Sequence, residues 1–234
     1  MDIFLQQLIN GLVIGSIYAL IALGYTMVYG ILNLINFAHG EVLMFGAMIT
    51  FSAVNFLAGM QLPLSGYTLL LLGLLLALPP TMLLGYTIER VAYRRLRKAP
   101  RLAPLITAIG MSIVLQQTAV IIWGRDHRPF PDVIQRTSID IAGATITDLE
   151  IGMILISLAL MIGLLIVVEK SRLGRAMRAT AQNPEVAGLM GVNINTVVSL
   201  TFIIGSALAA VAGIMVHFAA LVPACEWLVA EQPA

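Results

Sequence analysis

Long stretches of the chain carry no Asp, Glu, Lys or Arg. After Asp2 the next charged residue is Glu41, and further charge-free runs cover 42–88, 102–124, 151–168 and 186–225. One helix crosses the hydrocarbon core of a bilayer in about 20 residues. The run at 42–88 is therefore long enough for two helices, and the turn residues between Gly59 and Gly66 divide it. The pattern predicts six membrane-spanning helices, at 8–30, 42–59, 67–88, 103–123, 150–168 and 196–221.

The composition agrees with a membrane protein. Of the 234 residues, 59% are hydrophobic and 11% are charged, against about 25% charged in an average soluble domain. This excludes a soluble enzyme and a disordered chain, and the net charge of +1 excludes nucleic-acid binding. The start, Met1–Ile3, lacks the basic region of a cleaved signal peptide, so we expect the first span to be retained. The fold class expected is an all-α, polytopic membrane bundle.

Lys and Arg indicate the orientation of the bundle. Of the 13 basic residues, six lie in Arg90–Arg101 and four in Lys170–Arg178. The other three, Arg125, Arg128 and Arg136, share the loop at 124–149 with acidic residues. By the positive-inside rule the first two segments are cytoplasmic, and the N-terminus and the loop at 124–149 lie outside. In this outer loop, alternating polar and apolar residues around Ala142-Gly143 predict a small β-hairpin, which should pack on the helix ends.

Small residues at four-residue spacing mark two candidate packing faces. Lipid provides no hydrophobic drive between helices, so their association relies on small residues that let backbones approach. The first face lies in the first span and the second in the sixth span: Gly11, Gly15 and Ala19, then Gly205, Ala209 and Gly213.

Four polar residues crowd between the first two spans: Asn33, Asn36, His39 and Glu41. Such groups are expensive at membrane depth unless they face protein or water. Two interpretations remain open. The segment is either a tight turn in which Asn side chains cap helix ends, or a broken or re-entrant element with His39 and Glu41 at the inner mouth of a conduction pathway.

The cytoplasmic loop at 170–194 predicts a single short helix. Asn183 is a suitable N-cap, Pro184 suits the first helical position, and Glu185 is favoured by the helix dipole. Gly191 is well placed to end the helix. A helix this short is not stable alone. It rests either on lipid headgroups, which suit the basic residues before it, or in a partner's groove, which suits the small apolar surface from Ala187 to Met190.

Several kinds of chemistry lack candidates. No glycine-rich loop ending in Gly-Lys-Ser/Thr occurs, so we expect no nucleotide binding by this chain. The three histidines, His39, His127 and His217, are far apart, and with one cysteine, Cys225, they predict no metal site. We therefore expect a non-catalytic chain that binds no cofactor.

Five segments closely resemble the branched-chain amino acid ABC transporter permease family, in that family's order. They are Gly24–Glu41, Ile88–Arg94, Ala108–Ile113, Gly174–Gly191 and Leu200–Gly213. The chain is similar to the smaller of the two permease subunits of that importer. The resemblance implies a bacterial inner-membrane location, a second permease subunit, two cytoplasmic ABC ATPases and a periplasmic binding protein.

The resemblance also implies that the short helix is the coupling helix that docks on the ATPase. The residues expected to couple the chain to the ATPase are Arg175, Arg178, Asn183, Pro184, Glu185, Ala187, Gly188 and Gly191. The permease domain is expected over 1–221. The tail at 222–234 does not resemble the family, which favours a truncated gene product.

The expected function is that of a permease subunit that moves branched-chain or related amino acids, coupled to a separate ATPase. Two alternatives remain: a truncated fragment that does not transport, and a secondary carrier or channel. A carrier would need ion-coupling charges within the spans, and apart from Glu41 at a boundary the sequence offers none. Whether the substrate is leucine-like, another amino acid or an amide such as urea stays open.

Overall fold

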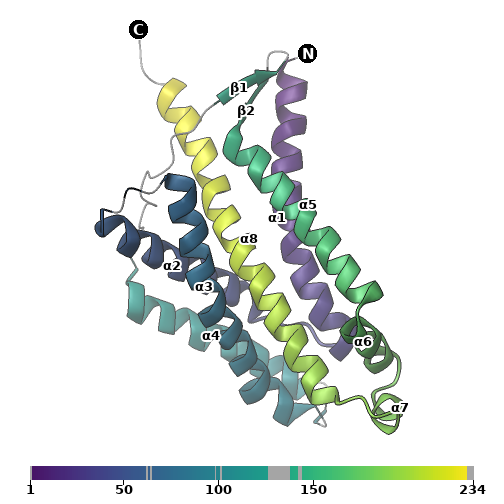
Figure 1. Cartoon of the computed structure of the whole chain (residues 1–234). Helices are drawn as coiled ribbons and strands as arrows, with labels where there is room; N and C mark the ends of the chain where they lie inside the picture. The colour runs from purple at the N-terminus through teal and green to yellow at the C-terminus, as the bar shows by residue number, and fades with distance from the viewer. Residues whose placement is uncertain are drawn as a thin grey trace.

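The computed structural model describes residues 2–61, 63, 65–97, 99–100, 102–125, 138–141 and 144–230. In these residues the chain forms α-helices and one small β-hairpin (Figure 1). Lys98, Arg101, His127, Arg128 and Arg136 lie outside the described residues. The elements are α1 (Asp2–Leu32), α2 (His39–Gly59), α3 (Gly66–Ile88), η1 (Glu89–Tyr93), η2 (Arg94–Leu96), α4 (Leu102–Trp123), β1 (Ser138–Ile141), β2 (Ala144–Thr147), α5 (Asp148–Lys170), α6 (Arg172–Gln182), α7 (Pro184–Leu189) and α8 (Ile194–Ala230).

Six helical segments are long and apolar enough to cross a membrane, which confirms the six predicted spans. Two helices continue well beyond the C-terminal ends that the sequence predicts. The third span continues from α3 through η1 and η2 to Leu96, because the charged Glu89 in its extension is neutralised inside the protein. The sixth span ends at Ala219, but its helix, α8, continues through residues 222–230 of the predicted tail.

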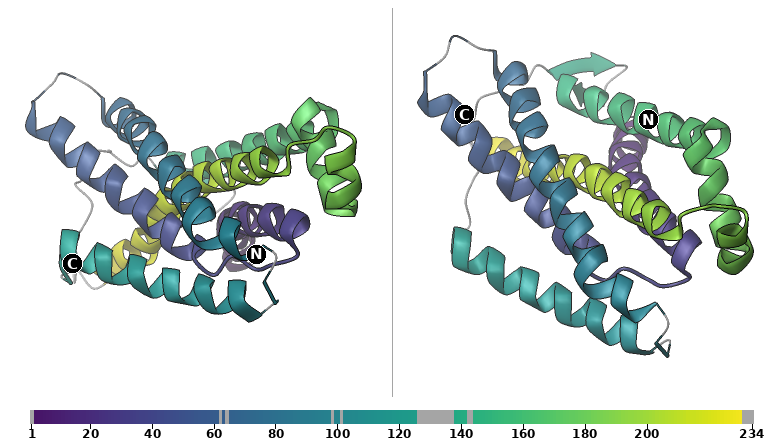
Figure 2. Two further views of the ribbon diagram at one scale, coloured as in Figure 1. Left: turned by 90° about the horizontal axis from the view of Figure 1, so that it is seen from below. Right: turned by 60° about the horizontal axis from the view of Figure 1, so that its bottom comes forward.

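Helix α8 lies at the centre of the bundle. In its membrane-spanning part 72% of the residues are buried, against 17–28% in the other five spans. Helices α1 and α5 lie on one side of it and α2, α3 and α4 on the other (Figures 1 and 2). The short helices α6 and α7 lie together at one end, here called the α7 end, and the β-hairpin lies at the other, the hairpin end (Figure 1).

Glycines bring α8 to backbone contact with its neighbours. A Cβ added to Gly213 would clash with the backbone carbonyl of Leu43 on α2, and one added to Gly46 would lie 2.6 Å from the Cα of Ala210. On the α3 side, a Cβ at Gly85 would clash with Ser206. The predicted small-residue face of the sixth span therefore lies at helix contacts: Ala209 is buried, and a Cβ at Gly205 would meet α1 at ordinary van der Waals distance.

The predicted small-residue face of the first span does not pack within the chain. Gly11 and Gly15 are exposed, and a Cβ added to either would meet nothing within 4 Å. The buried face of α1 instead carries larger residues, Val13, Ile17 and Leu20. These residues pack with large apolar side chains of α5 and α8, so this contact does not need the close approach that glycine allows.

The predicted hairpin is confirmed. Strands β1 and β2 pair antiparallel, from Ser138 opposite Thr147 to Ile141 opposite Ala144. The hairpin also packs on a helix end as expected, because the Gln6 side chain of α1 donates to the Thr145 carbonyl at 3.0 Å and accepts from the Thr145 amide at 2.8 Å. Thr147 and Glu150 then form a reciprocal capping box that starts α5.

These contacts predict opposite effects of the same substitution at two glycines. Gly213→Ala puts a methyl group into the backbone of α2 and should destabilise the chain by about 1–3 kcal/mol, as overpacking does. Gly15→Ala should be neutral, or stabilising by up to about 1 kcal/mol, since the site is open and alanine favours a helix. SDS titration of the purified chain in mixed micelles measures both. Equal unfolding midpoints would contradict the packing described here.

Candidate functional site

The α7 end carries the short helix that the sequence predicts, and its two ends are closed by local hydrogen bonds. The Asn183 side chain accepts from the amides of Glu185 and Val186, at 3.0 and 3.1 Å, and Pro184 occupies the first turn. At the other end Gly191 has φ +86°. The amides of Gly191 and Val192 donate to the carbonyls of Gly188 and Ala187, which is the Schellman pattern. The predicted helix start and stop are confirmed.

The exposed surface of α7 differs from the expected one. Ala187 is only 3% exposed, so it anchors the helix on the protein and does not belong to an outer surface. The exposed apolar residues are Val186, Leu189 and Met190, at 52%, 87% and 80%. The reason is helical geometry: Ala187 lies about 100° around the axis from Val186 and 200° from Leu189, so it points inward where they point outward. These three are the large apolar side chains that α7 and its C-cap expose.

The basic residues before α7 bind the end of α5. Arg178 donates to the carbonyls of Val168 and Glu169, and Arg175 donates to the carbonyl of Lys170 at 3.3 Å. These are among the last four carbonyls of α5, which have no partner inside that helix. A Cβ at Gly174 would clash with the same helix end. Helix α6 is thereby attached to α5, and the arginines serve this attachment within the chain.

The segment between α1 and α2 is a turn in which both asparagines have local roles. Asn33 ends α1 in the left-handed conformation, with φ +51°. Asn36 is buried, and its side-chain oxygen accepts from the Ala38 amide at 3.1 Å and from the Tyr93 hydroxyl of η1 at 3.1 Å. The two asparagines therefore have the roles expected in a tight turn, but neither side chain caps a helix end: Asn33 acts through its backbone conformation, and Asn36 bonds the amide of Ala38, the N-cap residue of α2.

The same segment also re-enters the bundle. His39, the first residue of α2, packs on Gly24 and Tyr25, which lie about two turns before α1 ends. Glu41 bonds Ser112, half-way along α4, and Leu43 lies beneath Gly213, about five turns into α8. Contacts with α1, α4 and α8 thus show that α2 starts well inside the bundle and not at its α7 end. Both open interpretations hold in part: a turn leads into a recessed helix start.

The four polar residues of this segment are not brought together. Asn36 faces Tyr93, His39 faces α1, and Glu41 faces α4, where it accepts from Ser112 at 2.9 Å and from Gln116 at 2.7 Å. His39 and Glu41 diverge because residues two apart on a helix point about 200° apart. A role of these residues in a pathway stays a prediction.

A buried carboxylate that sequence reasoning missed lies beside this segment. Glu89 of η1 has 0% exposure and forms ion pairs with Arg94, at 3.4 Å, and with Arg97. Ser199 of α8 donates to it at 2.8 Å and accepts from Arg94 at 2.9 Å. We call Glu89, Arg94, Arg97, Asn195 and Ser199 the Glu89 network. The spacing of one glutamate with arginines five and eight residues later is the signal that could have found it.

Arg97 extends the Glu89 network to the first turn of α8. Its guanidinium donates to Asn195 at 3.0 Å as well as to Glu89. Burial lowers the pKa of Arg97, and the nearby Glu89 carboxylate opposes that shift by favouring the charged form. Because Tyr93 of the same η1 turn holds Asn36, the network joins the start of α8 to the re-entrant segment.

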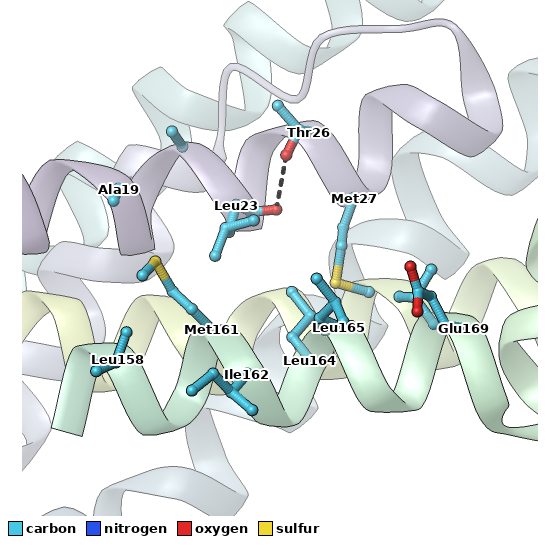
Figure 3. Close-up of a pocket in the computed structure, with 12 residues that line it drawn as sticks. Ala19, Leu23, Thr26, Met27, Leu158, Met161, Ile162, Leu164, Leu165 and Glu169 are labelled. Atoms are coloured by element: carbon cyan, nitrogen blue, oxygen red, sulfur yellow. Dashed lines mark hydrogen bonds between the residues drawn. The ribbon is translucent and has the colours of Figure 1, made fainter. Parts of the chain in front are cut away.

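A second feature of the site region is an open apolar groove between α1 and α5, of about 880 Å³. Ala19 and Thr26 of α1 and Met161 and Glu169 of α5 are among its lining residues, and Thr26 bonds back to its own helix (Figure 3). The groove continues the exposed small-residue face of α1. Among the described residues, no group of three His, Cys, Asp or Glu could hold a metal ion.

Residues 7–226 match the protein family described as branched-chain amino acid transport system, permease component. The chain is 45% identical to the high-affinity branched-chain amino acid transport system permease protein BraD of Pseudomonas aeruginosa, over 91% of this chain and 70% of that protein. It is 42% identical to the permease protein LivH of Escherichia coli, with the same coverage. A probable LivH protein of Methanocaldococcus jannaschii is 27% identical, over 93% and 68% of the two chains. No solved structure matches significantly.

The Glu89 network predicts a large loss of stability when its carboxylate is neutralised. Glu89→Gln leaves two guanidinium groups without their counter-charge and should cost about 3 kcal/mol, the lower end for breaking a buried pair because Arg94 is partly exposed. Glu169→Gln, at an exposed carboxylate of α5, is the control and should change stability little. The same SDS titration compares them, and similar midpoints for the two variants would show that Glu89 is not a structural centre.

Proposed function

This chain belongs to the family of permease components of branched-chain amino acid transport systems, and we propose that it couples to an ATPase through α7. It is a multi-pass, non-catalytic membrane subunit of an ATP-binding-cassette transport system. The proposed assembly contains a second permease subunit, two cytoplasmic ATPases and a periplasmic binding protein. In this assembly the α7 end faces the cytoplasm, as the distribution of Lys and Arg indicates.

The observation that carries the coupling role is the build of α7. A helix of six residues, closed at both ends and anchored by Ala187, presents Val186, Leu189 and Met190 to the outside. Exposed large apolar side chains on one short helix suit a groove in a partner protein. Their anchor is firm, because α6 is bonded to the end of α5 and Asn193 caps α8 directly after α7. A push on α7 would therefore reach two membrane spans at once.

The Glu89 network supports a route from α7 to the re-entrant segment. Asn195 and Ser199 lie in the first two turns of α8, where the chain leaves α7. They bind Arg97 and Glu89, and Tyr93 of η1 binds Asn36. Movement of the α8 start would thereby move η1 and the recessed start of α2. A route of this kind needs evidence of energetic coupling as well as contact, which the second experiment below supplies.

Docking through α7 predicts that two side chains are needed for assembly. Leu189→Ala with Met190→Ala removes apolar contact worth about 1.5–3 kcal/mol for each buried side chain, so ATPase recovered with the chain should fall more than tenfold. Leu102→Ala is the control, since Leu102 is 71% exposed at the same end. ATP-dependent uptake of leucine into proteoliposomes of the assembled transporter should fall with it. Full recovery of ATPase and uptake in the double variant would contradict the coupling role.

The proposed route predicts a separation of hydrolysis from transport at Tyr93. Tyr93→Phe removes the hydroxyl that Asn36 accepts from and keeps the ring against Phe202. The loss leaves a buried amide with one partner fewer, about 1–3 kcal/mol, so leucine moved per ATP should fall several-fold while ATPase recovery stays normal. Tyr86→Phe, which removes the hydroxyl of a half-buried tyrosine of α3 that accepts from Arg90, is the matched control. If both variants keep the normal ratio of leucine to ATP, the route through Tyr93 is wrong.

A further inference from the structure

The contact between α2 and α4 holds a carboxylate at the start of α2 and half-way along α4. Glu41 lies in the first turn of the recessed α2, and its Oε1 accepts from Ser112 at 2.9 Å and from Gln116 at 2.7 Å. Ser112 is the eleventh of the 22 residues of α4. At the C-terminal end of α4, Trp123 donates to Ser52 of α2 at 2.8 Å. The two bonds are eleven residues apart on each helix, from 41 to 52 on α2 and from 112 to 123 on α4. The two helices therefore run side by side in the same direction.

The surroundings of Glu41 differ from those of the other buried carboxylates. Glu89 has two arginines, and Glu150 caps its own helix. Glu41 has two neutral donors on one oxygen, and within the described part of the chain no Lys or Arg forms an ion pair with it. Glu41 is only half-buried, and Gln116 and the neighbouring Gln117 are exposed. The Glu41 side chain is thus partly open at the surface of the helix pair.

A carboxylate and the Gln116 amide on this surface are unfavourable against lipid tails. They are favourable where the surface faces water and a cationic group can approach. The helix pair also offers apolar contacts there, since Ile109 and Ile113 are exposed on α4 next to Ser112. A negative charge with hydrogen-bonding neighbours and aliphatic side chains beside it matches one chemical class, an aliphatic amino acid with its α-ammonium group.

We propose that the α2–α4 surface around Glu41 lines the water-filled path of the transporter and that Glu41 binds the α-ammonium group of the amino acid in transit. This rests on the function proposed above. Ser112 and Gln116 hold the carboxylate toward the path, and the recessed start of α2 places it at mid-depth. The contact is transient, because one charge interaction and a shallow apolar surface bind the amino acid weakly enough to release it.

Cysteine labelling of the assembled transporter in membrane vesicles tests this proposal. In a background with Cys225→Ser, Ser112→Cys places a thiol beside Glu41 and leaves Gln116 as its donor. Val114→Cys is the matched control: Val114 is 59% exposed but lies two residues on, about 200° around the helix. Cationic and anionic methanethiosulfonates of similar size are the probes, with their rates referred to those for a free thiol in solution.

The cysteine at position 112 should react at least about tenfold faster than that at 114, and the cationic reagent should be favoured. Adding Glu41→Gln should lower this cation preference about fivefold, because the attracting charge is gone. L-Leucine should slow labelling at 112, whereas 2-hydroxy-4-methylpentanoate, which has a hydroxyl in place of the ammonium group, should not. Glu41→Gln should abolish the protection by leucine.

Slow labelling at both positions would show that the surface faces lipid or a partner subunit, and would overturn the proposal. So would an unchanged cation preference or unchanged leucine protection in Glu41→Gln. If Ser112→Cys fails to assemble, Gln116→Cys replaces it with the same expected outcomes. ATP-dependent leucine uptake by the transporter without substitutions is measured in the same vesicles: its absence counts against the proposed function, and its presence without charge preference counts against the Glu41 site alone.

Discussion

Helix α8 reaches backbone contact with α2 and α3 because glycine stands at each crossing. Inside a bilayer, apolar side chains gain nothing from leaving water, so the free energy of packing comes from close contact and from buried polar bonds. Gly46, Gly85 and Gly213 supply the close contact. Without it, α8 would not lie at the centre of the bundle, and the start of α2 would not be held inside it. The re-entrant segment and the Glu89 network both depend on this arrangement.

Buried polar groups add to the helix contacts that the glycines allow. At the α7 end the buried Glu89 is surrounded by Arg94, Arg97 and Ser199, so a charged carboxylate is held with full pairing. Half-way along α4, Glu41 is held by neutral donors and stays half-exposed. The two carboxylates illustrate two uses of a charge within a membrane protein. A paired charge fixes helices to one another, and an unpaired charge is available to a ligand.

In the re-entrant segment the sequence predicts the local turn but not the distant neighbours. Asn33 and Asn36 are recognisable as turn residues, and both act as such. The neighbours of Asn36, His39 and Glu41 on η1, α1 and α4 are not recognisable, because they come from positions up to 75 residues away. The short helix α7 is a second example. Its caps at Asn183 and Gly191 are local and were predicted, whereas the inward direction of Ala187 depends on how α7 lies on the rest of the protein.

By itself the sequence determined the number of membrane spans, the short helix α7 and the hairpin, because each rests on local hydropathy, capping or alternation. Only the tertiary structure decided which small-residue face packs. The stripes at Gly11 and Gly213 follow the same spacing, yet one is open and the other meets a backbone. It also decided that Glu89 is buried and paired with two arginines, whereas Glu41 is half-buried and bonded to neutral donors. The physical reason is that burial, pairing and depth are properties of neighbours, and these neighbours are brought together only when helices distant in sequence pack.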